Sequence, residues 1–481
     1  ETPLGMEDIK RRRDLQKELA GGNENWRMEF LALGEKNRSQ TVNGKTKKID
    51  SAAVMDAMQK VSKMEVPAWF GSPVSLVIGW MMIIGVIGSV ILSICDMVSV
   101  DFALWWVLVQ YMVVFFVCKQ TLDKIDSNGG KLRHQLIAYA QILQLINRRN
   151  FHSESGKEMQ DSLADALPSF AQLEKILKGY DRRGNFLGLF FTDAFMLSDF
   201  FLVRSFLKWK NTYMVKMEEW MHIISEMDAM VSMADFRYNH PEAEEAEFVS
   251  GSPEADTESD VSENAGIGSP EIVFDGKNLY HPFLGAKAVK NDFTIKDDNY
   301  YIITGANMAG KSTFLRSLGV NYILAMAGMP VFADQLKISR FRLFSSMRTT
   351  DDLTHGISYF NAELIRLEEL LKFCKESAEG NKEPLRTLII LDEILKGTNS
   401  LDKLNGSRKF LEAIAKQPVS GIIATHDLEL SKMENDASGK FHNYCFEIDL
   451  GTDVTYTYKI QKGVARNQNA TFLLNKILEK Y

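Results

Sequence analysis

The pattern of apolar and charged positions divides the first half of the chain into helical segments of different character. In 1–66, apolar residues recur at near-helical spacing among Lys and Arg, which predicts charged helices over about 9–19 and 51–64. Longer amphipathic patterns in 131–238 predict a helical core and lever over 119–240. The pattern therefore favours a mainly helical N-terminal half.

Two uncharged runs interrupt this helical region, one at 74–95 and one at 102–118. A helix needs about 20 apolar residues to cross a bilayer, and the second run lies near the short end of that range. The flanks are rich in Lys and Arg, whereas the turn carries Asp96 and Asp101 and no basic residue. The positive-inside rule predicts a transmembrane hairpin over 74–118 in the cytoplasmic (inner) membrane, with the rest in the cytoplasm. The alternative is a pair of buried helices in a soluble core.

The second half of the chain begins with a change of composition. Residues 241–271 are acidic, rich in Ser, Gly and Pro, and free of Lys and Arg, which predicts a disordered linker or an interaction segment. In 272–481, apolar runs at 299–304, 387–392 and 420–425 alternate with helical patterns, which indicates a parallel α/β sheet. The predicted fold class is therefore α + α/β.

Charge and cysteine content limit the function only weakly. The formal net charge is −7, which is not typical of a DNA-binding protein, although the acidic segment hides any local basic surface. Basic runs at 9–13 and 147–149 could contact phosphates, and solvated helix faces explain them equally well. The four cysteines are not spaced like zinc ligands.

The most specific motif is the segment Gly305–Ser312, which fits G-x-x-x-x-G-K-[ST]. A predicted strand precedes it and a predicted helix follows from about Lys311, so its backbone N–H groups and the helix N-terminus would surround phosphates. We expect Lys311 to reach the β- and γ-phosphates and Ser312 to ligate Mg²⁺. The residues expected to contact ATP in this segment are Gly305, Ala306, Asn307, Met308, Ala309, Gly310, Lys311, Ser312 and Thr313.

Two further groups of polar residues follow apolar strands. Asp392 and Glu393 end the run 387–392 as in a Walker B motif, so Asp392 would hold Mg²⁺ and Glu393 would polarise the attacking water. His426 follows the next run, at the edge of an open α/β sheet where ligands bind, and could sense the γ-phosphate or position water. These motifs predict ATP hydrolysis with Lys311, Glu393 and His426 as catalytic groups.

Taken together and in this order, the motifs resemble the MutS family of DNA mismatch-repair ATPases. The similarity is strongest over about 279–481, and the segments that carry it are HPFLGAKAVKND, TGANMAGKSTFLR, MRTTDDLTHGISYFNAEL, LDEILKGTNSLDKLNGS and ATHDLEL. A weaker resemblance covers 1–66 and 131–238. The hairpin departs from the soluble repair proteins and resembles a membrane-associated MutS-related subgroup.

The resemblance implies a homodimer whose ATPase domains complete each other's sites. Ser358 would then reach the γ-phosphate of the partner's ATP, and Gly397–Asp402 would cross the dimer contact. Where the family places an aromatic and an aliphatic residue against adenine, this chain has Ala288 and Val289, and the Tyr458 ring could compensate. We also expect the segment 471–481 to form a final helix that supports the dimer.

The resemblance does not extend to mismatch reading. No mismatch-reading segment and no Phe-x-Glu wedge motif lie ahead of the helical core, so DNA contact would be mostly to phosphates. The predicted function is an ATP-hydrolysing, dimeric DNA-binding clamp on a membrane. The alternatives are a membrane-anchored ATP switch that binds no DNA and a transport ATPase of the ABC type, whose L-S-G-G-Q-like signature the sequence lacks.

Overall fold

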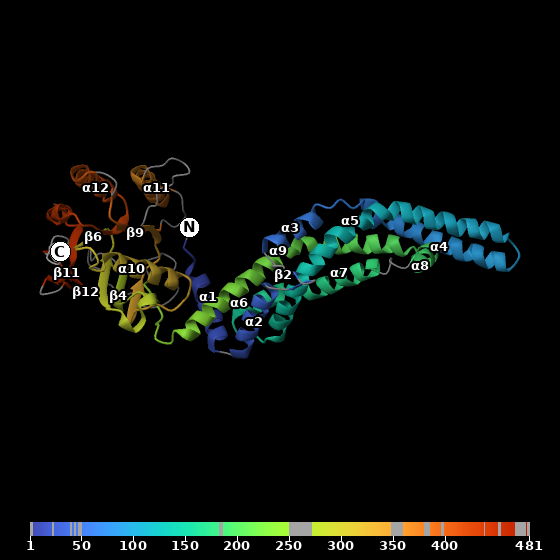
Figure 1. The fold of residues 1–481 in the computed structure, drawn as a ribbon, viewed down its shortest axis with the longest axis horizontal. Coiled ribbons are helices and arrows are strands. Elements are labelled where there is room, and N and C mark those ends of the chain that lie inside the picture. The colour runs from blue at the N-terminus through green and yellow to red at the C-terminus, as the bar shows by residue number, and fades with distance from the viewer. Residues whose placement is uncertain are drawn as a thin grey trace, which may run out of the picture. The chain divides into compact units, whose positions relative to one another are not determined.

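The computed structural model divides the chain into two compact units (Figure 1). One is the helical unit, Asp14–Phe236, and the other, here called the C-terminal unit, combines Glu1–Arg13 with Arg237–Tyr481. The first 13 residues, which the sequence pattern assigned to the helical region, therefore pack with the C-terminal unit. The structure describes residues 3–21, 24–38, 41–42, 45–46, 51–181, 186–249, 272–347, 359–379, 385–395, 399–436, 438–450, 454–466 and 478.

The helical unit is built around two long helices that pack with shorter ones. Its described helices are α1 (Met6–Gly21, which begins in the other unit), α2 (Glu24–Arg38), α3 (Ser51–Ser62), α4 (Pro73–Ile94), α5 (Val100–Arg148), α6 (Glu154–Ser162), α7 (Ala166–Asp181), α8 (Phe186–Met196) and α9 (Ser198–Asn239, which ends in the other unit). Two-residue strands, β1 (Thr41–Val42) and β2 (Lys45–Thr46), form a separate hairpin, and a 3₁₀ turn, η1, covers Ala68–Gly71.

A continuous apolar stripe along α9 forms much of this unit's core. Positions 217, 220, 224, 227, 231 and 234 are all buried, at the alternating spacing of three and four residues that keeps one helix face inward. Indole N–H groups fix the stripe against its neighbours. Trp209 donates to the Ser169 carbonyl of α7 at 2.9 Å, and Trp220 donates to the Ser162 carbonyl at the end of α6 at 3.1 Å.

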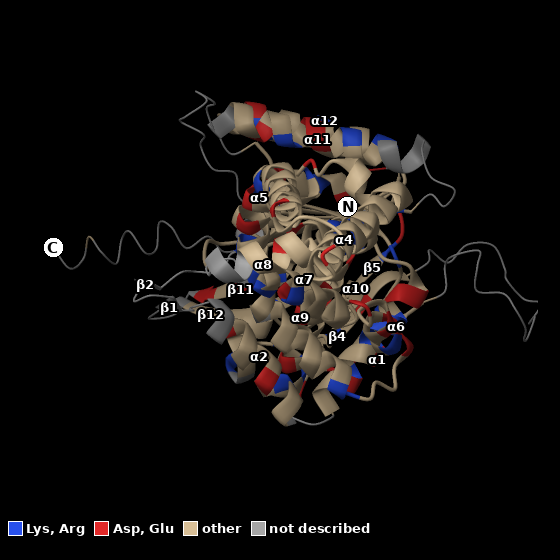
Figure 2. Cartoon of the chain, turned by 90° about the vertical axis from the view of Figure 1, so that its right-hand side faces the viewer, with Lys and Arg blue, Asp and Glu red and all other residues tan. Residues whose placement is uncertain are grey.

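Helix α4 and the first part of α5, residues 100–118, expose most of their apolar side chains. Helix α4 contains no Lys, Arg, Asp or Glu (Figure 2), and side chains such as Ile84, Trp105 and Phe116 are 66%, 66% and 70% exposed. Among the described residues, Pro73–Ile94 and Val100–Ile137 are long and apolar enough to cross a membrane. This exposure argues against the alternative of two buried helices in a soluble core.

The helical pattern predicted one boundary that the structure does not have. The apolar run that ends at Cys118 and the amphipathic pattern that follows belong to one uninterrupted helix, α5, because Leu122, Ile125, Leu132 and Leu136 continue the buried stripe beyond the apolar run.

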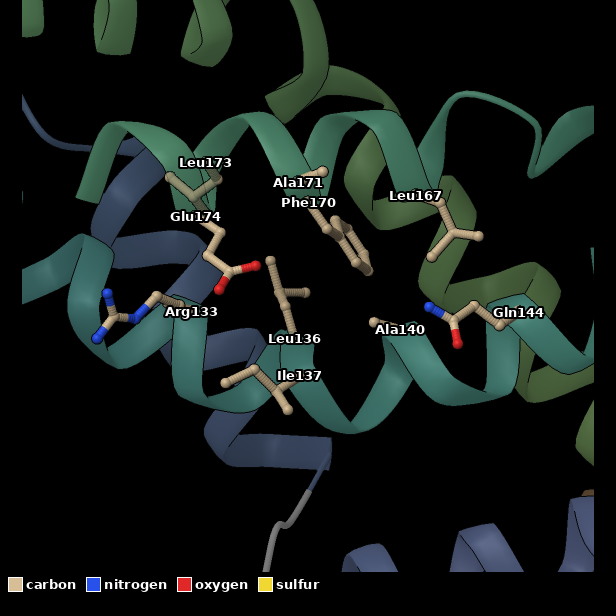
Figure 3. A pocket seen from close by; sticks show the side chains of 10 residues that line it. All are labelled: Arg133, Leu136, Ile137, Ala140, Gln144, Leu167, Phe170, Ala171, Leu173 and Glu174. Carbon is tan, nitrogen blue, oxygen red and sulfur yellow. The ribbon is translucent and has the colours of Figure 1, made fainter. Parts of the chain in front are cut away.

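A pocket of 250 Å³ lies between α5 and α7 in this unit (Figure 3). At one end Arg133 and Glu174 border the pocket, and Arg133 also pairs with Asp181 at 3.2 Å. None of the predicted site residues lines it. The lining residues are Arg133, Leu136, Ile137, Ala140, Gln144, Leu167, Phe170, Ala171, Leu173 and Glu174.

The C-terminal unit contains a six-stranded and a four-stranded sheet. The larger sheet has the order β12-β11-β6-β10-β9-β8, in which all neighbours except the antiparallel pair β11–β12 are parallel. The smaller sheet has the order β3-β7-β4-β5. The strands are β3 (Glu247–Phe248), β4 (Ile272–Leu279), β5 (Asn291–Lys296), β6 (Tyr300–Gly305), β7 (Gln335–Ile338), β8 (Arg342–Ser346), β9 (Thr387–Asp392), β10 (Val419–Ala424), β11 (Phe441–Leu450) and β12 (Val454–Lys462).

The C-terminal unit also contains three described α-helices, of which α10 contacts β6, β9 and β10 of the larger sheet. They are α10 (Lys311–Met326), α11 (Tyr359–Glu379) and α12 (Ser400–Ile414), with 3₁₀ segments η3 (Pro282–Lys287) and η4 (Leu428–Asn435). The strands β6, β9 and β10 are buried along their whole length, as expected for parallel strands covered on both faces. A helical unit beside a mixed α/β unit confirms the fold class α + α/β.

The start of the predicted acidic insert is ordered, contrary to the expectation for 241–271. Glu244 forms a β-bridge with Val331, and β3 pairs with β7. Glu245 forms ion pairs with Arg13, at 2.9 Å, and with Arg237. Arg13, Val331 and β7 lie far away in the sequence, so the composition of the segment did not reveal them, whereas Arg237 is only eight residues from Glu245. Residues 250–271 lie outside the described part of the chain.

Candidate functional site

Three neighbouring parallel strands end at the same level in the larger sheet. In the register, Ala424 at the end of β10 lies beside Asp392 at the end of β9 and beside Ile303 near the end of β6. The segments that follow these strands carry the Gly305–Ser312 loop, Glu393 and His426. The carboxyl ends of parallel strands are where open α/β sheets bind ligands.

The Gly305–Ser312 loop needs glycine at two positions. Gly305 has a φ of 151° and leaves no room for a side chain, because a Cβ there would lie 2.8 Å from the Phe446 carbonyl oxygen. Gly310 has a φ of 109° and is the N-cap residue of α10. Both conformations are accessible to glycine at little cost. They turn the chain from β6 directly into α10, whose first N–H groups have no partner within the helix.

Lys311 is buried at the first position of α10. Its Nζ donates hydrogen bonds to the carbonyl oxygens of Gly305, at 2.7 Å, and Ala306, at 2.9 Å. Burial lowers the pKa of Lys311 to about 8, although the charges of Glu393 and Asp392 partly oppose that shift. The ammonium group is thus buried, and the negative charges of Glu393 and Asp392 do not fully offset the cost of burying it.

Glu393 lies among groups from three elements. Its backbone N–H donates to the Ala424 carbonyl at 2.9 Å, and its φ is 63°, which is uncommon for a residue with a side chain. Its Oε1 lies 3.6 Å from Nε2 of His426 and 3.7 Å from Nζ of Lys403 on α12. Lys403 was not among the predicted site residues, because only its position ten residues after Glu393 marks it in the sequence.

His426 lies between the lysine and the carboxylate. Its Nδ1 lies 3.4 Å from Nζ of Lys311, and its other ring nitrogen, Nε2, is the one that lies nearer to Glu393. Burial and the Lys311 charge lower the pKa of His426 below 6.5, and Glu393 opposes this shift. The imidazole is therefore neutral near pH 7 and can both donate and accept a hydrogen bond.

A cavity of 490 Å³ adjoins the loop and contains both residues predicted to lie near a nucleotide base. Val289 and Tyr458 line it together with Met308, Gly310, Ser312 and Thr313. Sequence reasoning missed several other lining residues: Tyr280, His281, Leu284, Asn291 and Phe446.

Asn291 joins the two strands that border this cavity. Its side chain donates to the carbonyl oxygens of Val289, at 3.2 Å, and Tyr458, at 3.1 Å, and accepts from the Ile460 N–H at 2.9 Å. Val289 and Tyr458 are therefore held together although 168 positions separate them in the sequence. Tyr458 is 43% exposed, so its ring is available to a ligand.

The two predicted metal ligands belong to adjoining elements of this edge. Ser312 lies in the first turn of α10 and Asp392 is the last residue of β9, which is largely buried. Within the described ranges, no group of three or more His, Cys, Asp and Glu residues could hold a metal ion. A site with one hydroxyl and one carboxylate would rely on phosphate oxygens and water for its other ligands, which is usual for Mg²⁺.

Some predictions fall outside the described residues. Ser358 and the segment 396–398 belong to these, as does 471–481 apart from Leu478. The described part of the expected dimer segment, 399–402, lies at the start of α12. There the Asn399 side chain accepts a hydrogen bond from the Asp402 N–H at 2.9 Å.

Comparison with known proteins identifies relatives of the segment that carries this site. Residues 301–472 match the model of MutS domain V. A DNA mismatch repair protein MutS from Lachnoclostridium phytofermentans is 32% identical over 213 residues, which are 41% of this chain and 22% of the relative. Those from Persephonella marina and Thermotoga neapolitana are 31% and 30% identical over 195 and 179 residues, which are 39% and 37% of this chain and 21% of each relative.

The C-terminal unit is thus of the α/β class that includes MutS domain V, with a Gly-rich loop at the carboxyl edge of its sheet. Residues 301–472 are similar to domain V of the MutS family, as the sequence motifs predicted. The matched region spans less than a quarter of the length of these curated relatives.

Proposed function

We propose that the protein is a Mg²⁺-dependent ATPase of the MutS type, anchored in a membrane, whose nucleotide cycle controls a dimeric DNA-binding clamp. The observation that carries the catalytic part is the convergence of Lys311, Glu393 and His426 at the ends of three adjacent parallel strands. Separate observations support the base site and the membrane anchor.

The loop and α10 fit the phosphate end of a nucleotide. The N-terminus of α10 offers unpaired N–H groups and positive potential, and Lys311 is a buried cation that an anion would stabilise. Ser312 and Asp392 would hold Mg²⁺, which supplies positive charge to the phosphoryl oxygens. Glu393 would orient and deprotonate the attacking water, while neutral His426 would accept a hydrogen bond from Lys311 and present its Nε2 toward Glu393.

The cavity beside the loop fits the base. A planar base could stack on the Tyr458 ring and contact Val289, with Asn291 fixing the distance between those two residues. The cavity combines apolar residues such as Leu279, Leu284 and Val289 with polar ones such as His281, Lys287 and Thr313. The expected contact of Ser358 with the partner's γ-phosphate remains a prediction of the family resemblance.

The exposed apolar surface of α4 and α5 supports the membrane anchor. Soluble monomers seldom expose contiguous apolar patches larger than a few hundred Å². Here exposed side chains continue along both helices, and α4 alone has Val74, Val77, Ile78, Trp80, Met81, Ile84, Ile87 and Ile91 in this state. Transfer of such surface from water to hydrocarbon gains about 25 cal/mol per Å².

The test is ATP turnover by the full chain in detergent or lipid nanodiscs. We expect Lys311→Met to abolish turnover and Lys372→Met to leave it unchanged, because Lys372 is an exposed residue of α11 that pairs with Glu368. Normal turnover in Lys311→Met would refute the site. Since this chain's relatives are MutS proteins, a transport ATPase is not proposed.

The DNA part is tested in the same assay with duplex, mismatched and branched DNA at two salt concentrations. Stimulation that weakens as salt rises would support a clamp acting through phosphate contacts. Turnover that no DNA changes would contradict the clamp and favour an ATP-dependent membrane switch.

A further inference from the structure

A third apolar segment lies close to the two candidate spanning helices. Helix α8, Phe186–Met196, has the sequence FLGLFFTDAFM, with Asp193 as its sole charged residue. Helix α9 follows at once and begins with Ser198, Asp199, Phe200 and Phe201. At 11 residues, α8 is too short to cross a bilayer.

Helix α8 contacts α4 and α5 near the middle of their apolar segments. The rings of Phe190 and Tyr111 are 5.0 Å apart, and the Gln110 side chain donates to the Ala194 carbonyl at 2.8 Å. Val86 of α4 belongs to the same buried cluster. At 1.5 Å per residue, Val86 lies about 20 Å from the start of α4 and Gln110 about 15 Å from the start of α5. Both depths fall inside a hydrocarbon layer of about 30 Å.

The segment with α8 begins and ends at the open end of the α4–α5 hairpin, which is the end opposite to the turn at 95–99. Asp181, at the end of α7, pairs with Arg133, which lies 22 residues beyond Tyr111 on α5, or about 33 Å along the helix. On the return, Arg204 of α9 donates to the carbonyl oxygens of Phe70, at 2.7 Å, and Ser72, at 2.8 Å, next to the start of α4.

The polar groups of the corner between α8 and α9 face the protein. Asp193 and Asp199 are buried, and the Asp199 N–H donates to Asp193 Oδ1 at 2.8 Å. Leu197, which forms the corner with a φ of 49°, is 2% exposed. Backbone that leaves the helical conformation is tolerated at membrane depth only where protein covers it. The outward face instead presents Phe191 and Met196, which are 58% and 66% exposed, together with the exposed, uncharged Thr192.

We propose that α8 and the first turn of α9 form a re-entrant membrane segment, with Phe191 and Met196 in contact with lipid acyl chains. The inference rests on the proposed membrane anchor and extends it from two helices to three elements. Lipid is the occupant because the outward face of α8 continues the exposed apolar surface of the helices that it contacts. The anchor then holds a buried acidic residue, Asp193, near mid-depth, where charged groups are costly and are retained for a structural or functional purpose.

The experiment measures the depth of a fluorophore attached to single cysteines in the full chain, reconstituted into vesicles. Exposed Cys95 is first replaced by serine, and the remaining cysteines, Cys118, Cys374 and Cys445, are buried. The test position is Phe191→Cys. The matched references are Ile87→Cys on the exposed face of α4 and Val215→Cys, 85% exposed on α9 beyond Arg204. Quenching is compared between lipids brominated on their acyl chains and iodide in the water.

We expect the Phe191 and Ile87 labels to lose the same fraction of fluorescence to brominated lipid and to resist iodide, and the Val215 label to do the reverse. If the Ile87 label meets lipid but the Phe191 label is quenched by iodide, α8 is not re-entrant and the hairpin anchor stands. If iodide also quenches the Ile87 label, the anchor itself is wrong. Protection of the Phe191 label from both quenchers would mean that protein, such as a second copy of the chain, covers α8.

Discussion

The depressed pKa of Lys311 predicts how nucleotide affinity depends on pH. In the free protein the pKa of Lys311 is about 8, whereas phosphates bound next to the ammonium group would return it toward or above its ordinary value of 10.5. Below pH 8 the lysine is charged in both states and affinity does not change. Above pH 8, binding must take up a proton, so affinity falls as pH rises until about 10.5. At pH 9 only about one-tenth of the free protein is protonated, which weakens binding about tenfold, or by about 1.4 kcal/mol.

Isothermal titration with a non-hydrolysable ATP analogue and Mg²⁺ measures both quantities. Repeating it at pH 7 and pH 9 in buffers of different ionisation enthalpy counts the protons taken up, which we expect to rise from about 0.1 to about 0.9 per site. Lys311→Arg is the control because arginine stays charged throughout this range, so its binding should show no such pH dependence. His426 is neutral in the free protein because its pKa is lowered, and any proton that it takes up on binding would also appear in Lys311→Arg, so the difference between the two proteins reports Lys311.

The reasoning fails if the wild-type protein binds the analogue equally well at pH 7 and pH 9 without proton uptake. The lysine would then be charged in the free state at pH 9, and the burial seen around Nζ would not be the environment in solution. An equal pH dependence in Lys311→Arg would also refute it, because the titrating group would be a different one.

Three other substitutions test separate parts of the structure. Glu393→Gln should slow single-turnover hydrolysis by about 10²- to 10⁴-fold while nucleotide still binds, and an unchanged rate would exclude Glu393 as the base. Tyr458→Ala should weaken ATP binding by about 1–3 kcal/mol, the usual value of base stacking on an aromatic ring, without affecting tripolyphosphate, and equal losses for both ligands would contradict the base site. Arg204→Ala removes charged hydrogen bonds to the start of α4 and should lower the free energy of unfolding in detergent by about 1.5–3 kcal/mol. The control is Lys208→Ala, one turn further along α9, and it should leave the free energy of unfolding unchanged.

The parts of the site that the sequence predicted are those encoded within a short stretch of chain. The run 300–304, the glycines at 305 and 310 and the helix from Lys311 form one local strand–loop–helix unit, and the structure has it at the predicted positions. The acidic pair after β9 and His426 after β10 were predictable for the same reason. Buried parallel strands read as continuous apolar runs, so their ends, and the residues that follow them, are visible in the sequence.

Contacts between distant residues were not visible in this way. Lys403 approaches Glu393 because α12 returns to the strand edge, and Asn291 holds Val289 near Tyr458 through hydrogen bonds across two strands. The order of 241–249 has in part the same origin, since its acidic composition alone favours solvation but Arg13, from the other end of the chain, and β7 pair with it. Composition describes a segment in isolation, whereas these residues are fixed by partners elsewhere in the fold.

The apolar helices α4, α5 and α8, for which we propose a place in the membrane, illustrate both situations. An uncharged run is a strong local signal, so α4 and the apolar part of α5 were predicted from the sequence. Helix α8 gives a weaker signal, because Asp193 interrupts its apolar run and its length matches a helix of a soluble core. What distinguishes it are two hydrogen bonds: the Gln110 side chain donates to the Ala194 carbonyl, and the Asp199 N–H donates to the Asp193 carboxylate, whereas Phe191 and Met196 face outward. Burial of Asp193 with the Asp199 N–H, and of the Ala194 carbonyl with Gln110, is therefore the condition that would allow so short a helix to enter the bilayer. Loss of these two hydrogen bonds should expel α8 without removing the hairpin.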